Sequence, residues 1–131
     1  MKKFLSSLLA LTMILSLVIV PANAAADDIS LDETTVTAVK GGQAVTVTAT
    51  APDLTNCAEL QNKDGYTADT NTVSWNWSKT SSAFDISGAT SNQVSITGKS
   101  KTTAAQTLTC TYSVTYKKAD ADDIVVTRRA N

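Results

Sequence analysis

Histidine is absent from this chain of 131 residues. Its absence excludes Ser-His-Asp and Cys-His catalysis and every metal site that depends on an imidazole ligand. A glycosidase-type pair needs one carboxyl group held in an apolar pocket. The aspartates that could be considered lie instead in polar loops, and they are Asp64, Asp69, Asp120, Asp122 and Asp123. We therefore expect no enzymatic activity and no cofactor.

Clustered positive charge is lacking too. The chain has 11 basic and 12 acidic residues. Removing Lys2 and Lys3, which belong to the N-terminal segment described next, leaves nine basic residues against 12 acidic ones, a net charge near −3. Binding to nucleic acid or to an anionic membrane needs clustered lysine and arginine. We expect neither partner.

The N-terminus has the pattern of a secretory signal peptide over residues 1–24. Two lysines precede an apolar run over residues 4–20, and Ala22-Asn23-Ala24 forms an A-x-A cleavage site. The alternative is a retained membrane anchor, for which the apolar run is near the lower length limit. Cleavage is favoured, and it leaves a secreted domain of residues 25–131 that does not insert into a membrane.

The chain has two cysteines, Cys57 and Cys110. Two cysteines in an exported protein most simply form one disulfide. A Cys57–Cys110 bond would close a loop of about fifty residues, which is worth about 4 kcal/mol in the chain-entropy model.

Helical periodicity is missing after residue 25, and apolar and polar residues alternate with a period of two. The longest alternating segment places Leu108, Cys110, Tyr112, Val114 and Tyr116 on one face and Thr107, Thr109, Thr111, Ser113 and Thr115 on the other. The predicted strands are 35–39, 44–50, 73–77, 84–86, 93–96, 107–116 and 124–127, with 29–31 as an added edge segment.

About seven short strands, with tryptophans between two cysteines, predict an all-β chain folded as an immunoglobulin-like antiparallel β-sandwich. The longest irregular stretch is residues 53–72, rich in Asn, Asp and Gly. With the turns at the same end, it is the expected contact surface, because rigid sandwiches present their loops.

Four strings, at residues 42–50, 73–78, 93–98 and 106–112, resemble the bacterial immunoglobulin-like domains of group 2, the type found in intimin- and invasin-like adhesins. The similarity covers residues 29–127. It implies adhesion, spacing or ligand presentation without catalysis. The chain departs from the family in standing alone and in the length of residues 53–72. The antibody-type cysteine spacing is also not kept, so Cys57 could instead tie the long loop to the sheet.

The tryptophans allow two interpretations. Trp77 matches the buried strand tryptophan of the resemblance, and we expect it in the core. Trp75 is favoured as a second core residue nearer the end of the sandwich. Alternatively, Trp75 and Tyr66 form an exposed platform that stacks on sugars.

Calcium is the one metal to consider, because Asn and Asp side chains gather at residues 62–71 and 120–123. Neither stretch has the spacing of a known calcium loop, so no metal site is predicted. The sequence as a whole predicts a secreted, non-catalytic adhesion or ligand-binding module whose partner is a protein or a glycan at a cell surface. A small carbohydrate-binding module is the alternative.

Overall fold

The computed structural model describes residues 14–18 and 27–131. Most of the predicted signal peptide, residues 1–24, lies outside the described residues. Within the described part, no helix is long and apolar enough to cross a membrane. The strands are β1 (Ile14–Val18), β2 (Ser30–Leu31), β3 (Thr35–Val39), β4 (Val45–Thr50), β5 (Thr67–Lys79), β6 (Phe84–Ser87), β7 (Gln93–Gly98), β8 (Leu108–Lys117) and β9 (Ile124–Ala130), and a single 3-10 turn, η1, covers Ala58–Leu60.

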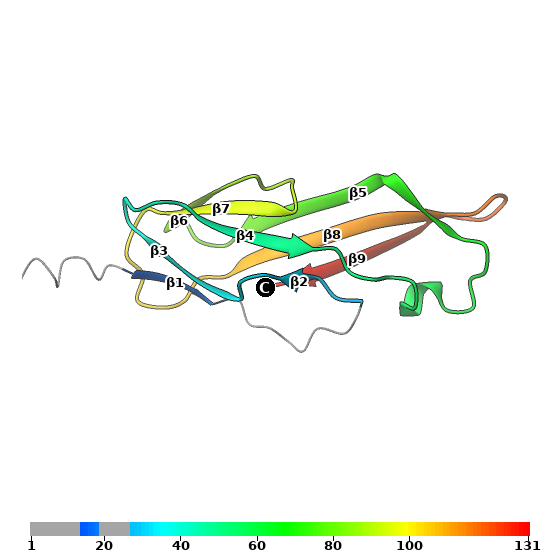
Figure 1. Cartoon of the computed structure of the whole chain (residues 1–131), viewed down its shortest axis with the longest axis horizontal. Helices are drawn as coiled ribbons and strands as arrows, with labels where there is room; N and C mark the ends of the chain where they lie inside the picture. Colours follow the sequence, from blue (N-terminus) through cyan, green and yellow to red (C-terminus); the bar gives the residue numbers. More distant parts are fainter. Residues whose placement is uncertain (1–13, 19–26) are drawn as a thin grey trace, which may run out of the picture.

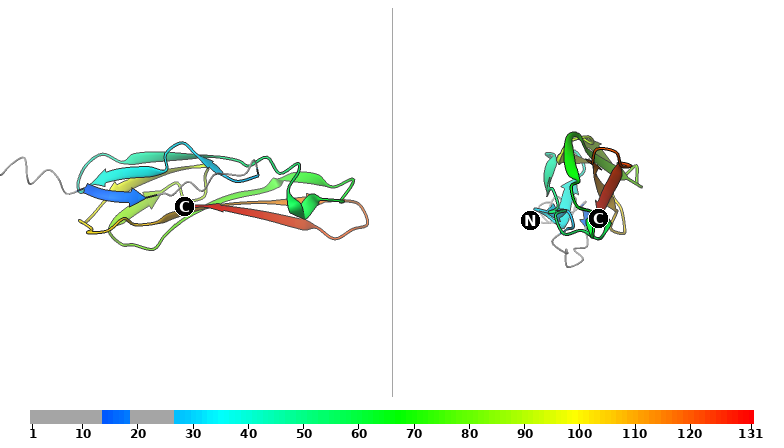
Figure 2. Two further views of the ribbon diagram at one scale, coloured as in Figure 1. Left: turned by 90° about the horizontal axis from the view of Figure 1, so that it is seen from below. Right: turned by 90° about the vertical axis from the view of Figure 1, so that its right-hand side faces the viewer.

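The strands form two main antiparallel sheets that pack face to face (Figure 1). One sheet has the order β2-β4-β7-β6, and the other has the order β5-β8-β9. With β2, β4, β5, β6, β7, β8 and β9 taken as strands A to G, these orders are the ABED and CFG sheets of the constant-type immunoglobulin sandwich. The predicted fold class is therefore confirmed. Figure 2 shows the two layers in an end-on view.

The core lies between the two sheets because each strand turns alternate residues inward. In β8 the buried positions are Leu108, Cys110, Tyr112 and Val114, with half-buried residues between them. Opposite them, β4, β7 and β6 contribute Val47, Ala49, Val94, Ile96 and Phe84, all at most 1% exposed. The alternation of apolar and polar residues in the sequence thus matches the alternation of buried and less buried residues in the strands.

The three-stranded sheet is longer than the other and extends past its end (Figure 1). The segment between β4 and β5, which contains η1, lies beside this extension and close to β9 in both side views (Figures 1 and 2). Leu54 and Cys57 of this segment are buried in the core, and Leu60 packs against it. This stretch therefore fills the place that the shorter sheet does not reach.

The prediction that residues 53–72 are irregular is wrong at its C-terminal end, because β5 begins at Thr67. The pairing of β5 with β8 shifts between Asp69 and Ser74, so residues 70–73 lie opposite Val114 alone. Such an insertion interrupts the alternation, which hides the strand from a period-two search. The bulge is held by Thr72, whose hydroxyl donates to Asp69 O at 2.7 Å and accepts from Thr115 N at 2.8 Å.

Candidate functional site

Trp77 lies in the core and is 2% exposed. Its Cα is directly opposite that of Cys110 on β8. The indole Nε1–H donates to the carbonyl oxygen of Ser91 at 2.8 Å, so the one polar atom of the ring has its hydrogen bond. This residue supports the sheet and is not available to a ligand.

Trp75 projects from the same face of β5 and is half-buried. Its ring meets Tyr112 edge to face, with 4.8 Å between centroids and 62° between planes. Tyr112 is itself part of the core. Trp75 therefore packs at the margin of the core, and much of its ring is already in contact.

Tyr66 precedes the first residue of β5 and lies at the other end of that strand. Its hydroxyl donates to Asp122 O at 3.1 Å, and Lys118 Nζ lies 5.8 Å from the ring centroid. Thr67 is opposite Lys117, whereas Trp75 is opposite Tyr112. The five residue steps along β8 from Tyr112 to Lys117 span about 17 Å. The structure does not bring Trp75 and Tyr66 together into one sugar-stacking platform.

The predicted disulfide is not formed, because Cys57 and Cys110 are both free and both buried. Cys110 is opposite Trp77 and Ala130. Cys57 belongs to the segment between β4 and β5, directly before η1, whereas Cys110 is on β8. The structure therefore has two separate buried thiols in place of the predicted disulfide.

Arg128 forms a charged cluster that the sequence reasoning missed. Its side chain is 13% exposed and contacts Glu59 through two hydrogen bonds, of 2.7 and 2.9 Å. It also donates to Asp27 Oδ2 at 3.0 Å and to Asp27 O at 2.9 Å. The hydrogen bond from Arg128 lowers the pKa of Glu59 to about 2, and the two carboxylates raise the pKa of Arg128. The alternation of the sequence could have indicated this position, because Arg128 shares the inward face of β9 with Val126.

This cluster joins three distant parts of the chain. Arg128 is on β9, Glu59 is in η1, and Asp27 begins the described part of the domain. Every member has a charged partner, so the cluster leaves no unpaired charge for a substrate or a metal. Its chemistry is that of a structural clamp.

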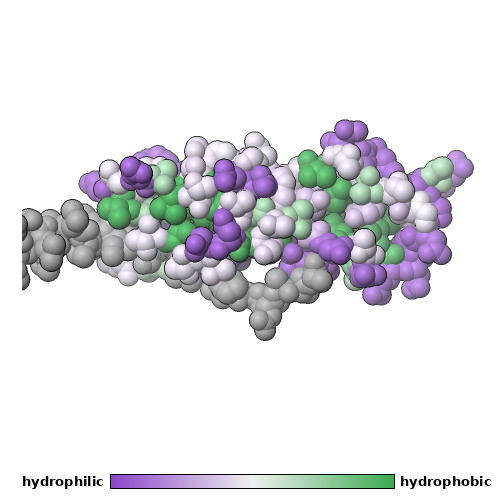
Figure 3. Space-filling view, viewed as in Figure 1, coloured by the Kyte–Doolittle hydropathy of each residue, from purple (hydrophilic) through white to green (hydrophobic). Residues whose placement is uncertain are grey.

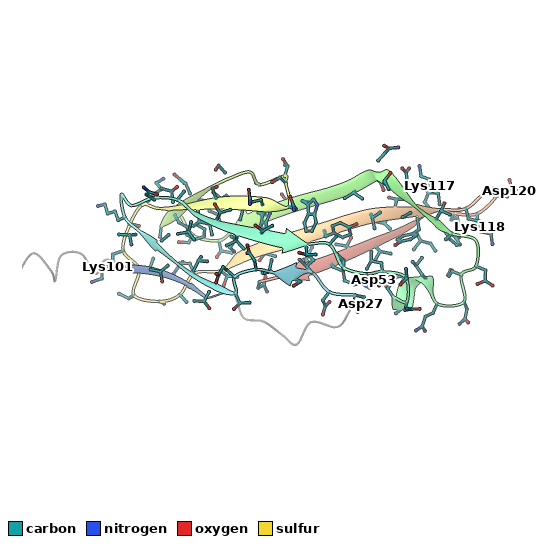
Figure 4. The ribbon with its side chains drawn as sticks, in the orientation of Figure 1. Asp27, Asp53, Lys101, Lys117, Lys118 and Asp120 are labelled. Atoms are coloured by element: carbon teal, nitrogen blue, oxygen red, sulfur yellow. The ribbon has the colours of Figure 1, made fainter. Side chains whose placement is uncertain are left out.

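Charged residues gather at the end of the molecule where β8 turns into β9. Hydrophilic residues cover this end (Figure 3), and Lys117, Lys118 and Asp120 lie there, at the opposite end from Lys101 (Figure 4). Lys117 Nζ pairs with Asp69 at 2.9 Å, and Lys118 Nζ donates to Asp64 O at 2.8 Å. Within residues 14–18 and 27–131, no group of three or more acidic, cysteine or histidine side chains is placed to hold a metal ion.

The outward side of the sheet β5-β8-β9 carries an ordered set of hydrogen-bonding side chains. We call it the outer polar face, and it consists of the polar residues Ser74, Asn76, Ser78, Thr109, Thr111, Ser113, Thr115, Thr127 and Arg129 together with the apolar Val125. The residues on β5 and β9 are exposed, and those on β8 are half-buried between them.

The outer polar face is arranged in rows across the three strands. Asn76, Thr111 and Arg129 form one row. In the next row, Ser113 shares a hydrogen bond of 2.7 Å with Thr127. The row after that ends in Val125, an apolar side chain that is 62% exposed. The face therefore offers one cation, one apolar contact and many hydroxyl and amide groups on a rigid sheet.

Comparison of the chain with protein-family models, curated proteins and solved structures finds no match in any of the three. The resemblance to bacterial immunoglobulin-like domains therefore stays a prediction from the sequence.

Proposed function

We propose that this protein is a secreted, non-catalytic module that adheres to a protein on a cell surface through the outer polar face. The observation that carries the proposal is the combination of exposed Arg129 and exposed Val125 on one rigid sheet surface. The N-terminal signal pattern supports export, and the sequence resemblance to adhesin domains supports a binding role.

The chemistry of the face fits a protein partner. Arginine is enriched among the residues that dominate protein–protein binding energy, and such residues are surrounded by contacts that exclude water. Asn76 and Thr111 lie beside Arg129 and can hydrogen-bond an extended polypeptide. Because Trp77, Cys110 and the other inward residues fix the reverse side of the sheet, the surface is preorganised, and little conformational entropy is lost on binding.

A glycan is the second candidate ligand. The hydroxyl and amide groups of Ser74, Asn76 and Ser78 would hydrogen-bond sugar hydroxyls, and all three are exposed. The outer polar face itself contains no aromatic ring to stack on a sugar, and Trp75 points to the opposite side of β5. This is why a protein partner is favoured.

The experiment is the binding of the labelled exported domain to intact bacterial and animal cells. Cells are used untreated, after trypsin, or after periodate oxidation of glycans. The proposal expects binding that trypsin abolishes and that Arg129→Ser and Val125→Lys each reduce by at least about tenfold. Thr46→Lys, at an exposed site on the other sheet, is the matched control and should bind normally.

Two results would count against the proposal. Loss of binding after periodate but not after trypsin would make the protein a carbohydrate-binding module. Binding that both face variants retain would place the contact elsewhere, and the charged end at Lys117 and Lys118 would be examined next.

A further inference from the structure

One edge of β3 is paired with β1, a strand that cleavage of the predicted signal peptide would remove. The five residues of β3 form their ladder with β1, in antiparallel register from Ile14↔Val39 to Val18↔Thr35. β1 lies within residues 1–24, the predicted signal peptide. Cleavage before Ala25 would take β1 away and leave the backbone N–H and C=O groups of β3 along this edge without their partners.

The rest of β3 is held in place by the mature domain. Val36 and Ala38 are buried in the core. At its C-terminal end, Lys40 forms a bridge with Gly98 of β7. A Cβ on Gly98 would come within 2.9 Å of the Val39 backbone, so only glycine permits this close approach. β3 is therefore a fixed template after β1 has left.

The edge lacks the features that usually prevent strand pairing. Natural edge strands are protected by charged side chains, proline, bulges or a covering segment. β3 reads Thr-Val-Thr-Ala-Val, with Thr35, Thr37 and Val39 exposed. The covering segment is the one protection present, and it is the part that cleavage removes.

We propose that, in the exported protein, β3 pairs with β3 of a second copy in antiparallel orientation about a two-fold axis. The inference rests on the removal of residues 1–24 in the proposed function. The same edge already accepts an antiparallel strand in the full chain. In a two-fold pair centred on Thr37, the Thr37 side chains of the two copies face each other, a favourable cross-strand contact.

The charges that flank β3 favour a second copy over an unrelated strand. Glu33 precedes the strand, and Lys40 follows it; both are exposed. Antiparallel pairing reverses the chain direction, so Glu33 of each copy comes near Lys40 of the other. A five-residue ladder is short, and the dimer is accordingly a weak one that forms at high local concentration.

The first test uses protein exported from the full gene, with intact mass establishing that residues 1–24 are gone. Sedimentation velocity over a concentration series should show reversible dimers. Thr37→Lys places like charges close together across the axis and should weaken the dimer by about fivefold or more. Thr46→Lys adds the same charge at an exposed position of β4, a strand already paired with β7, and should not weaken it.

The second test exchanges charges. Lys40→Glu and Glu33→Lys should each reduce self-association, and an equimolar mixture of the two variants should restore it as a heterodimer. A monomer at all concentrations, or equal effects of Thr37→Lys and Thr46→Lys, would overturn the proposal. An intact mass that still includes residues 1–24 would instead count against export, so the two failures are distinguishable.

Discussion

Arg128 contacts both carboxylate oxygens of Glu59, with Nη1–Oε1 at 2.7 Å and Nη2–Oε2 at 2.9 Å. The two residues are 69 positions apart in the chain. Their contact fastens η1 to β9, and the same guanidinium reaches Asp27. The irregular segment before β5 is thereby fixed beside the sheet by charge as well as by the burial of Leu54 and Cys57.

The first prediction concerns acid. Because the pKa of Glu59 falls from 4.5 to about 2 in the folded state, its carboxylate stabilises the fold above pH 4.5, and this contribution is lost as the pH falls from 4.5 towards 2. Glu59→Gln should lower the melting temperature at pH 7 and flatten its decline over that range. The effect should be modest, because the Glu59 side chain is 38% exposed. Glu33→Gln is the control for loss of charge alone, and an equally flattened curve in it would contradict the role of Arg128.

The second prediction concerns Trp77. Trp77→Ala should reduce the free energy of unfolding by about 3–5 kcal/mol, because it empties a large buried site. Trp77→Phe keeps part of the volume but leaves the Ser91 carbonyl without its donor, so its cost should be smaller. Urea denaturation followed by circular dichroism would measure both. An alanine variant with unchanged stability would mean that Trp77 is not a core residue.

The third prediction concerns the thiols. Burial raises the pKa of Cys110 to about 12, so at neutral pH it is a protonated and unreactive thiol. Native protein should take up no maleimide, and unreduced protein in guanidinium should take up two labels per chain. Mass spectrometry would count the labels. Fewer than two labels without reductant would show that a cysteine is already bonded.

Much of the fold could be predicted because a strand with one buried and one exposed face has alternating apolar and polar residues in its sequence. The strand predicted at 35–39 is β3 itself, and 44–50 and 107–116 match β4 and β8 to within one residue at each end. The inward position of Arg128 was readable from the same alternation in β9. An inward arginine needs a charged partner, and Glu59, which is 69 positions away, could not be identified from the residues around Arg128.

The features that could not be predicted all depend on contacts between distant residues. The number of cysteines gave no information on where each one lies in the fold, so a disulfide was expected where the structure has two separate thiols. The bulge in β5 breaks the alternation, and its stabilising partner, Thr115, is 43 residues from Thr72. The platform of Trp75 and Tyr66 was the alternative interpretation, based on the stacking of aromatic rings on sugars, whereas the structure places Tyr66 before the first residue of β5 and Trp75 in the C-terminal half of that strand.

The fourth prediction tests that bulge. The Thr72 hydroxyl takes the place of a backbone acceptor for Thr115 N–H, at 2.8 Å, and donates to Asp69 O at 2.7 Å. Thr72→Val keeps the shape but leaves the Thr115 N–H without this acceptor. Leaving a buried donor unsatisfied costs about 1–3 kcal/mol, and the partial burial here places the expected loss near 1 kcal/mol. Thr70→Val, at an exposed site in the same bulge, is the matched control and should change stability little.

Hydrogen exchange separates a local effect from a global one. In Thr72→Val the Thr115 amide should lose protection more than the amides near Trp77, because the bulge lies towards the Lys117 end of β5. A destabilised Thr72→Val variant with uniformly reduced protection would mean that the bulge unfolds only with the whole sheet. Equal stability of the two valine variants would show that the hydroxyl does not hold the register shift. The long β5 strand would then depend on the Lys117–Asp69 ion pair at its end.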